Sequence, residues 1–356
     1  MKKFFIIVLS LLFMPLLYSY KPNYNRVFAQ ENSSEIVMDV YSGRVLFGKN
    51  INAKMYMAST TKILTAITVI ENCDINKIVT VTDKTINVEG SSIYLRAGEK
   101  LSVLDLLYGL MLCSGNDCAE TLAVHCSGTI DKFCDLMNET AKKIGAYNSN
   151  FVNPHGLHND NHYTTAYDLA LISRYSMKNE TFRKIVSTKS ITISSENSES
   201  KRYLINKNKM LKDFPGSTGI KTGFTKKAGR CLVSSCIRDN MELICVVLNV
   251  PAMFERSKEL LTNCFNDYSA TKLVLSKNII DFIEIKNSNN KCGIYIKNDI
   301  ILPLKNEEKN NIETKYIYPY LINKNVKKDT EIGCVKILYK KSLLFSEKIY
   351  NIVDTN

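Results

Sequence analysis

The chain has 356 residues, of which 45% are hydrophobic, enough for one sizeable core and a smaller second one, so we expect two domains. Its formal net charge is +12, from 47 basic and 35 acidic residues. The basic residues form no Lys/Arg block and no DNA- or RNA-binding motif is present, so we expect no nucleic-acid partner.

Residues 1–29 predict a secretory signal peptide. Two lysines precede a 14-residue apolar run from Phe4 to Leu17, which is short for a membrane span. Small residues at Val27 and Ala29 suit cleavage after Ala29. The stretch after Leu17 is long for a cleavage region and carries two basic residues, so an uncleaved N-terminal anchor is the alternative. Either way, we expect the body of the protein to be exported.

The charge of the exported part is modest. All 35 acidic residues follow Ala29 and four of the 47 basic residues precede it, so the remainder carries +8. This excess fits anionic wall polymers or lipid headgroups as surroundings. The sequence shows no amphipathic C-terminal segment, so secretion, an N-terminal anchor or retention by wall charge are the expected modes of attachment.

The elements follow in chain order. The first is a β-hairpin with its turn at Ser42-Gly43, and a strand is expected over 77–83. Ser102, with Asp105 three residues later, has the spacing of a helix cap, and Gly145 is a helix stop. Apolar residues at helical spacing predict helices over 59–72, 102–112, 117–126, 129–145 and 164–177.

After Gly219 the pattern changes to strands. Three are expected over 219–225, 229–237 and 241–250, followed by a helix over 254–268. Strands at both ends with helices between them predict an α/β protein of the α+β type, with an antiparallel sheet and an inserted helical region. From about residue 276 the composition predicts short strands over 291–304, 314–322 and 331–352. The expected division is therefore 1–29, 30–275 and a small all-β domain over 276–356.

Three short motifs could carry chemistry. Ser59 and Lys62 form S-x-x-K at a helix start, where a neutral lysine could take the serine proton. The spacing alone is weak, because S-x-x-K also begins at Ser198, Ser269 and Ser288, and an isolated Ser59 would be a structural N-cap. S-x-N begins at Ser114, in the turn between two helices, and also at Ser195, Ser276 and Ser288. K-T-G, Lys221 to Gly223, occurs once, on a predicted strand.

The order S-x-x-K, S-x-N, K-T-G is the motif set of β-lactamases and penicillin-binding proteins. The sequence resembles the serine D-alanyl-D-alanine carboxypeptidases, the low-molecular-mass penicillin-binding proteins. The segments "SGRVLFGKN", "MASTTKILTAI", "EGSSIYLRAGEKLSVLDLLYGLMLCSGND", "FVNPHGL" and "NHYTTAYDLALI" carry the resemblance. It covers roughly 35–270 strongly and implies a β-lactamase/transpeptidase-like fold.

The resemblance also implies roles. Ser59 is the acylated nucleophile with Lys62 as its general base, and Ser114 assists proton transfer to the leaving amine. Asn116 positions the substrate amide. Lys221 and Thr222 of the K-T-G motif bind the terminal carboxylate of the substrate, and Gly223 belongs to the same binding strand. The backbone N–H groups of Ser59 and Phe224 form the oxyanion hole for the carbonyl under attack. Members of the family often have an arginine after the last strand that helps to bind the substrate carboxylate. Arg256 is the arginine nearest to that position, but the sequence does not fix its register, so it is left out of the predicted site.

Histidines and cysteines have plainer interpretations. His155, His158 and His162 lie close in sequence, but they belong to the "NPHGL" region and lack a supporting carboxylate or cysteine pattern, so no metal and no other cofactor are expected. The eleven cysteines include no C-x-x-C pair and are interpreted as small apolar core residues. Cys113 and Cys118, beside the S-x-N turn, could instead be a redox switch.

The predicted function is an exported carboxypeptidase that removes the last D-alanine from peptidoglycan stem peptides and is acylated by β-lactams. One alternative is a β-lactamase, which the S-G-N motif and the following second domain disfavour. The other is a non-catalytic protein that binds wall peptides; the three intact motifs disfavour it.

Overall fold

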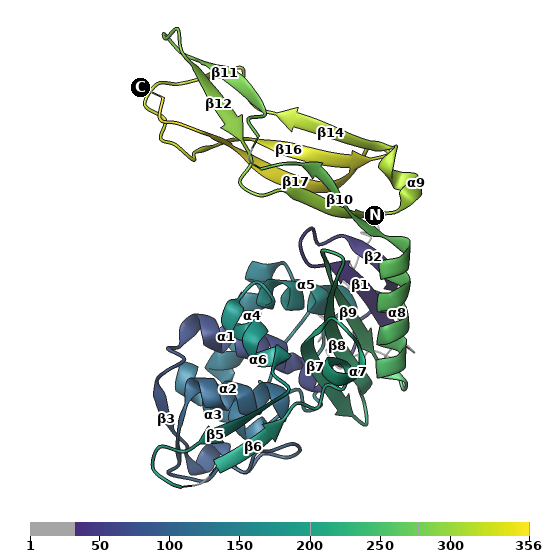
Figure 1. Ribbon diagram of the computed structural model, residues 1–356. Coiled ribbons are helices and arrows are strands. Elements are labelled where there is room, and N and C mark those ends of the chain that lie inside the picture. Colours follow the sequence, from purple (N-terminus) through teal and green to yellow (C-terminus); the bar gives the residue numbers. More distant parts are fainter. Residues whose placement is uncertain (1–32, 200, 277, 356) are drawn as a thin grey trace, which may run out of the picture.

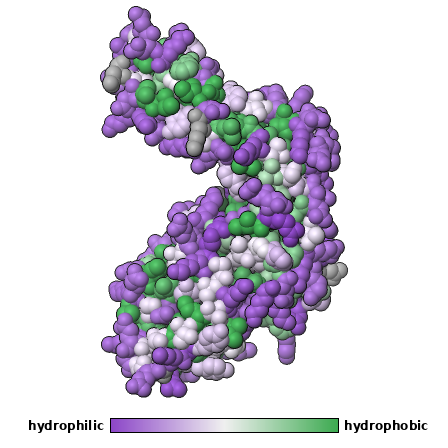
Figure 2. Space-filling view, viewed as in Figure 1, coloured by the Kyte–Doolittle hydropathy of each residue, from purple (hydrophilic) through white to green (hydrophobic). Residues whose placement is uncertain are grey.

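A computed structural model describes residues 33–199, 201–276 and 278–355. The predicted signal segment, 1–29, lies outside the described residues. The chain forms a larger part, which contains a sheet and most helices, and a β-rich C-terminal part (Figure 1). In the space-filling view the two parts border a wide notch on one side of the molecule (Figure 2). Within the described ranges, none of the helices has the length and apolar character needed to cross a membrane.

The larger part is built on a five-stranded antiparallel sheet in the order β2-β1-β9-β8-β7. β1 pairs with β9, so the first strand of the chain joins one that follows the helical region, as predicted. Asp239 and Asn240 both have positive φ, 49° and 61°, and form the tight turn between β8 and β9. The strands are β1 (Ser34–Asp39), β2 (Val45–Lys49), β7 (Ser217–Thr225), β8 (Gly229–Arg238) and β9 (Met241–Leu248).

Alternation along the strands builds a three-layer arrangement. Ile36 and Met38 of β1 face a core shared with the inserted helices, whereas Val37 between them faces a second core. Helix α8 (Met253–Asp267) covers that second face and contributes Leu260 and Leu261 (Figure 1). The sheet is therefore enclosed on both faces, which explains the long apolar runs of β8 and β9.

The inserted helices begin and end within about three residues of the expected bounds. The Ser102 side chain accepts the Asp105 backbone N–H at 3.0 Å and caps α2. Gly145, with φ of 96°, ends α4 in the left-handed conformation. The helices are η1 (Ala58–Thr61, a 3-10 turn), α1 (Lys62–Asn72), α2 (Val103–Leu112), α3 (Asn116–Ser127), α4 (Ile130–Ile144) and α5 (Ala166–Ser176). The predicted fold class is confirmed.

Several short elements of the larger part were not predicted. They are η2 (Asp83–Thr85), β4 (Lys100–Ser102), α6 (Glu180–Ser187), the hairpin of β5 (Ser190–Ser194) and β6 (Lys201–Ile205), and α7 (Met210–Asp213). β4 pairs with β3 (Ile78–Thr80), which lies inside the strand expected over 77–83. The β5–β6 hairpin lies beside the inserted helices (Figure 1).

The C-terminal part has its own sheet, in the order β14-β16-β17-β12-β11-β15, and a separate β10–β13 pair. An apolar core that includes Ile294, Leu302 and Ile337 fills it. Its elements are β10 (Ser269–Val274), β11 (Asp281–Ile285), β12 (Lys291–Tyr295), β13 (Ile300–Leu304), α9 (Asn306–Lys309), β14 (Ile312–Ile317), β15 (Leu321–Ile322), β16 (Glu331–Tyr339) and β17 (Ser342–Asn351). The expected all-β C-terminal domain is thus present.

Polar contacts join the two parts. The Arg44 guanidinium donates to both carboxylate oxygens of Glu308 and to the Pro303 carbonyl. The Tyr41 hydroxyl donates to the Asp299 carbonyl at 2.8 Å. Arg44 and Glu308 are both mostly buried, with side chains 12% and 9% exposed, so solvent screens this ion pair only weakly.

Candidate active site

The fold brings the three motifs into one region. Ser59 lies on η1, directly before α1, and Lys62 is the first residue of α1. Ser114 and Asn116 lie where α2 gives way to α3. The motif Lys221–Gly223 lies in the middle of β7, which packs against η1.

Lys62 is the centre of the hydrogen-bond network. It is fully buried, and its Nζ donates to the Asn116 Oδ1 and to the His155 carbonyl, both at 2.7 Å. Its distance to the Ser59 Oγ is 3.3 Å. Ser59 does not cap a helix: neither η1 nor α1 has a side-chain cap. The N-cap alternative for Ser59 therefore finds no support in the geometry.

Burial and neighbouring cations change the acidity of both lysines. Burial, with the nearby Lys221 and Lys207 cations, lowers the pKa of Lys62 well below its usual range. Burial, assisted by Lys207, lowers the pKa of Lys221 to about 7. Lys207 itself is exposed and donates to the Ser91 hydroxyl at 3.2 Å. It was not among the predicted site residues, because a lysine in an exposed loop has no motif of its own.

Asn116 is fixed from both ends of its amide. Its Oδ1 accepts from Lys62, and its Nδ2 donates to the Glu89 carbonyl. An amide nitrogen has two hydrogens, so one N–H remains for a ligand. The neighbouring Asp117, 1% exposed, anchors the loop that carries Glu89 by accepting from the backbone N–H groups of Ile93 and Leu95.

Ser114 and Thr222 lie in the same region, but neither side chain is hydrogen-bonded to Ser59 or Lys62. Ser114 is 5% exposed and has a positive φ of 66°, which turns the chain sharply between α2 and α3. Within the ranges that the structure describes, its hydroxyl has no hydrogen bond to Ser59 or Lys62. The Thr222 carbonyl accepts from the Lys221 Nζ at 3.0 Å, and the Thr222 side chain is half-buried.

The glycine of K-T-G allows a close backbone approach. A Cβ on Gly223 would lie 3.0 Å from the Ser59 backbone nitrogen and 3.2 Å from the Met57 carbonyl. The strand therefore runs directly beside the serine, which requires a residue without a side chain. Phe224, the next residue, is 60% exposed, and the Arg230 guanidinium lies 5.5 Å from its ring centroid.

The "NPHGL" segment supports η1 and α1 from another side. The Pro154 carbonyl accepts from the Thr65 hydroxyl and the His155 carbonyl from Lys62, both at 2.7 Å. A Cβ on Gly156, whose φ is 91°, would lie 1.9 Å from the Ala58 carbonyl oxygen. These contacts use backbone atoms and a glycine, so side-chain reasoning from the sequence did not assign them to the site.

The three histidines of this segment have separate partners. His155 lies 3.4 Å from a Glu120 oxygen, and His158 lies 3.3 Å from an Asp160 oxygen. His162 is bonded to the Thr61 hydroxyl at 2.7 Å, and burial lowers its pKa to about 3. Across residues 33–199, 201–276 and 278–355, no group of three or more His, Cys, Asp or Glu side chains could hold a metal ion.

Comparisons with known proteins show the family of the chain. Residues 23–252 match the family model of D-alanyl-D-alanine carboxypeptidases. The chain belongs to the D-alanyl-D-alanine carboxypeptidase family. Residues 268–354 of this family member also match the model of the C-terminal domain of penicillin-binding protein 5.

Relatives cover most of the carboxypeptidase chain. It is 31% identical to D-alanyl-D-alanine carboxypeptidase DacF of Bacillus subtilis over 329 residues, which is 90% of this chain and 84% of the relative. The structure of penicillin-binding protein 5 from Haemophilus influenzae is similar with a TM-score of 0.76 and 28% identity, over 92% of this chain and 98% of that one. PBP3 from Streptococcus pneumoniae, at 20% identity, shares the fold with a TM-score of 0.78 over 92% of this chain and all of that one.

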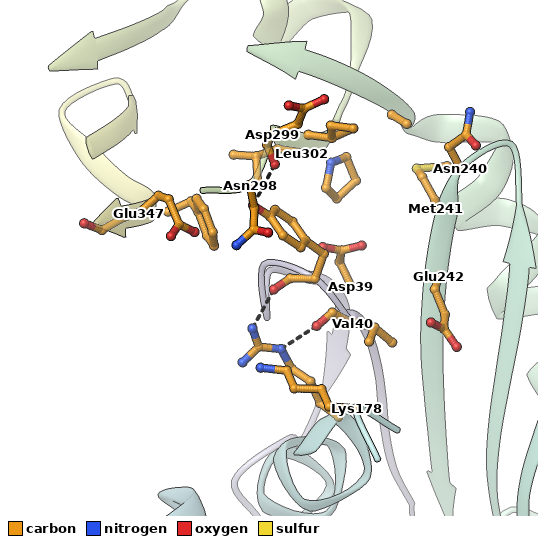
Figure 3. Close-up of a pocket in the computed structure, with 17 residues that line it drawn as sticks. Asp39, Val40, Lys178, Asn240, Met241, Glu242, Asn298, Asp299, Leu302 and Glu347 are labelled. Atoms are coloured by element: carbon orange, nitrogen blue, oxygen red, sulfur yellow. Dashed lines mark hydrogen bonds between the residues drawn. The ribbon is translucent and has the colours of Figure 1, made fainter. Parts of the chain in front are cut away.

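A cavity of about 720 Å³ lies between the two parts of the carboxypeptidase, and none of the predicted site residues lines it. Asp39, Val40 and Lys178 reach it from the larger part, and Asn298 and Glu347 from the C-terminal part (Figure 3). Arg174 in this cavity donates to the carbonyls of Val40 and Tyr41. These hydrogen bonds fix the turn between β1 and β2, so the Arg174 guanidinium is engaged by the protein itself. We therefore assign the cavity to the junction between the two parts.

Proposed function

We propose that this carboxypeptidase removes the terminal D-alanine from peptidoglycan stem peptides through an acyl-enzyme on Ser59, and that β-lactams acylate the same serine. The observation that carries the proposal is the buried Lys62 amine, 3.3 Å from the Ser59 hydroxyl, with its pKa lowered. A lowered pKa brings the lysine closer to the neutral form, which can act as a base.

The partners of Lys62 orient its lone pair. A neutral amine has two hydrogens, and the acceptors on Asn116 and His155, both at 2.7 Å, are the closer ones. With both hydrogens engaged there, the lone pair is left to face Ser59. Lys62 then takes the hydroxyl proton as the Ser59 oxygen attacks the carbonyl between the two D-alanines. Ser114 assists the transfer of that proton to the departing amine.

Substrate binding uses β7 and the α2–α3 turn. Lys221 and Thr222 bind the terminal carboxylate, and the free N–H of Asn116 binds the peptide carbonyl. A bound carboxylate favours the charged form of Lys221, whose pKa of about 7 in the free protein leaves it partly neutral. The backbone N–H groups of Ser59 and Phe224 stabilise the oxyanion, and loss of one such donor typically costs about 10²–10³-fold in kcat.

A β-lactamase would need a carboxylate poised to activate the deacylating water. Asp117 is committed to the backbone N–H groups of the loop that it anchors, and Glu120 pairs with His155 at 3.4 Å. Neither is hydrogen-bonded to Ser59. This arrangement favours slow release of a β-lactam over rapid hydrolysis, and a carboxypeptidase over a β-lactamase.

The proposal extends to location and domain division. Residues 1–29 direct export, and the peptidase activity lies within residues 30–275. The β-rich domain, expected from residue 276, starts with β10 (Ser269–Val274) and so takes in the last residues of that range. The protein acts outside the cytoplasmic membrane, at the wall or the membrane's outer face. Attachment through the N-terminal segment or by wall charge is part of this proposal.

The test is D-alanine release from a peptide ending in Lys-D-Ala-D-Ala, with Ser59→Ala as the matched variant. We expect release by the wild type and a loss of at least about 10³-fold in the variant. Labelled penicillin should bind covalently to the wild type alone. A folded wild type that neither releases D-alanine nor becomes labelled would refute the enzyme and leave the wall-peptide-binding alternative.

A further inference from the structure

Two half-buried cysteines meet at the end of the helix pair that supports the candidate site. Cys73 follows α1 as its C-cap residue, and Cys126 lies in the last turn of α3. Both side chains pack against the same core, and the two thiols are hydrogen-bonded to each other. At the opposite end of the same helices, Lys62 bonds to Asn116 at 2.7 Å. The helices therefore run parallel, joined at one end by the site and at the other by two thiols.

The contact shifts the pKa values of the two thiols in opposite directions. The hydrogen bond from Cys73, with a further one involving Ser127, lowers the pKa of Cys126 to about 7 against the opposing effect of burial. The same hydrogen bond and burial raise the pKa of Cys73. The pair therefore favours the thiolate of Cys126, the form that attacks a disulfide, over that of Cys73.

We propose that Cys73 and Cys126 form an intramolecular disulfide on reaction with a small-molecule disulfide, and that this cross-link fastens α1 to α3. The Cys126 thiolate attacks one sulfur of the oxidant R–S–S–R and releases one RS⁻. The Cys73 thiol then gives its proton to that thiolate and attacks the Cys126 sulfur, releasing the second RS⁻, which takes a proton from solvent. Two electrons pass to the oxidant, which ends as two thiols.

The other cysteines are placed differently. Seven are buried, and burial raises the pKa of Cys118, Cys134 and Cys231. Among the described residues, thiol-to-thiol hydrogen bonding is found for Cys73 and Cys126 alone. Their setting also suits a cross-link: Glu71, Asn72 and Asp74 beside Cys73 are exposed, as are Gly128 and Thr129 beyond Cys126, so a small oxidant can approach.

The cross-link would enclose the segment that contains Ser114 and Asn116. Closing such a long segment restricts the unfolded chain, which stabilises the folded state. The bond would lie one helix length, roughly 16 Å for eleven residues at 1.5 Å each, from the Lys62 end of α1. We therefore expect a gain in stability without a change at Ser59.

The experiment uses the full chain, reduced and then incubated with oxidised glutathione. We expect the intact mass to fall by two hydrogens, and a proteolytic digest to contain one linked pair of peptides, with Cys73 in one and Cys126 in the other. The melting temperature should rise by roughly 5–10 °C and return on reduction. Cys126→Ala should lose the link and the rise in Tm, whereas Cys334→Ala, which changes a half-buried cysteine of β16, should keep both.

Three results would overturn the proposal: no linked peptide in folded, oxidised wild type; a link between other cysteines; or the same rise in Tm in Cys126→Ala. The wild-type digest, compared with and without a reductant, decides the question even where a variant does not fold. A change in penicillin acylation on oxidation of more than about tenfold, or 1.4 kcal/mol, would contradict the assignment of the link to the remote ends of the helices.

Discussion

At the scale of single residues, Lys62 shows how burial and hydrogen bonding prepare a base. Its side chain is fully buried, and its hydrogen-bond partners among the described residues are an amide oxygen, a carbonyl and the Ser59 hydroxyl, with no carboxylate. Burial and the neighbouring Lys221 charge act against the charged form of Lys62 and lower its pKa. The environment therefore shifts Lys62 towards the neutral amine that a base requires.

The exposed Lys207 should affect the pKa of Lys62 and with it the pH range in which Lys62 acts as a base. Its positive charge lowers the pKa of Lys62 and of Lys221. Since the neutral form of Lys62 is the active one, activity rises with pH through the pKa of Lys62. Lys207→Gln removes a charge that favours the neutral form, so the pKa rises and the acidic limb of the acylation profile moves to higher pH. The measurement is the rate of labelled-penicillin acylation as a function of pH.

Lys209→Gln is the matched control, because Lys209 is an exposed lysine two residues away that does not contribute to the shift at Lys62. Its profile should match that of the wild type. An acidic limb that stays in place or moves to lower pH in Lys207→Gln would show that Lys207 does not act on Lys62 through its charge.

The sequence could predict the Ser59–Lys62 pair but not what holds it. S-x-x-K at a helix start puts both side chains on one face, which the 3.3 Å contact reflects. The carbonyls of Glu89 and His155 that complete the network belong to the backbone, which every residue has, so no residue type announces them. The role of Lys207 could not be predicted for a related reason. Lys207 follows the β5–β6 hairpin and affects the pKa of Lys62 only because the folded chain brings the two lysines close together.

At the scale of elements, two glycines place backbone against both sides of η1. Gly223 of β7 and Gly156 of the "NPHGL" segment each leave no room for a Cβ, the first near the Ser59 nitrogen and the second near the Ala58 carbonyl. Ala58 itself has a positive φ of 47°. The turn that presents Ser59 is therefore held by contacts from two elements distant in sequence, which is how a strained conformation persists.

Gly223→Ala should disturb this turn. Its new methyl group would press on the Ser59 nitrogen and the Met57 carbonyl, at 3.0 Å and 3.2 Å, and these backbone atoms cannot rotate away as a side chain can. Small displacements of a nucleophile cost up to about 10²-fold in rate, so we expect acylation by labelled penicillin to fall roughly 10–100-fold. The melting temperature should change little.

Gly48→Ala in β2 is the comparison variant, because its nearest contacts are with the flexible side chains of Ile51 and Val45. It should acylate at the wild-type rate. Equal rates for Gly223→Ala and Gly48→Ala would mean that the strand does not constrain the position of Ser59.

Long periodic elements were predictable and short exposed ones were not. The helices α2, α4 and α5 combine an apolar face with a side-chain cap at Ser102, Thr129 and Thr165, so pattern and capping agree. The hairpin of β5 and β6 has exposed residues at most positions and only one buried residue in each strand, Ile193 and Leu204. Such strands give almost no apolar alternation for the sequence to display.

At the scale of the whole molecule, a few contacts decide how the two parts are joined. Arg44 reaches from the larger part to Glu308 and Pro303 and lies 5.5 Å from the Tyr268 ring centroid. β10 follows α8 directly and pairs with β13, so the chain enters the C-terminal part as a paired strand. The sequence indicated the change of composition but not this pairing, because register between distant strands depends on the assembled cores.

Arg44→Met should loosen the junction. It leaves the Glu308 carboxylate without its partner in a mostly buried place, which typically costs about 3–5 kcal/mol. We expect faster limited proteolysis near β10 and α9 and an unfolding transition at a lower temperature. The rate of penicillin acylation should stay within twofold of wild type. Lys49→Met, which removes the exposed partner of Glu35, should behave as wild type. Unchanged proteolysis in Arg44→Met would assign the junction to its apolar contacts instead.

The pairing of β1 with β9 has a consequence for the order in which the chain can fold. Ser34 lies opposite Leu248, so the central strand pairing of the sheet joins residues from the beginning and the end of the larger part. Contacts so far apart in sequence form slowly, because the intervening chain must first lose its freedom. During synthesis β1 can pair with β2, but its other edge has no partner until β9 has emerged. The sheet of the nascent protein therefore stays incomplete until most of the larger part has been made.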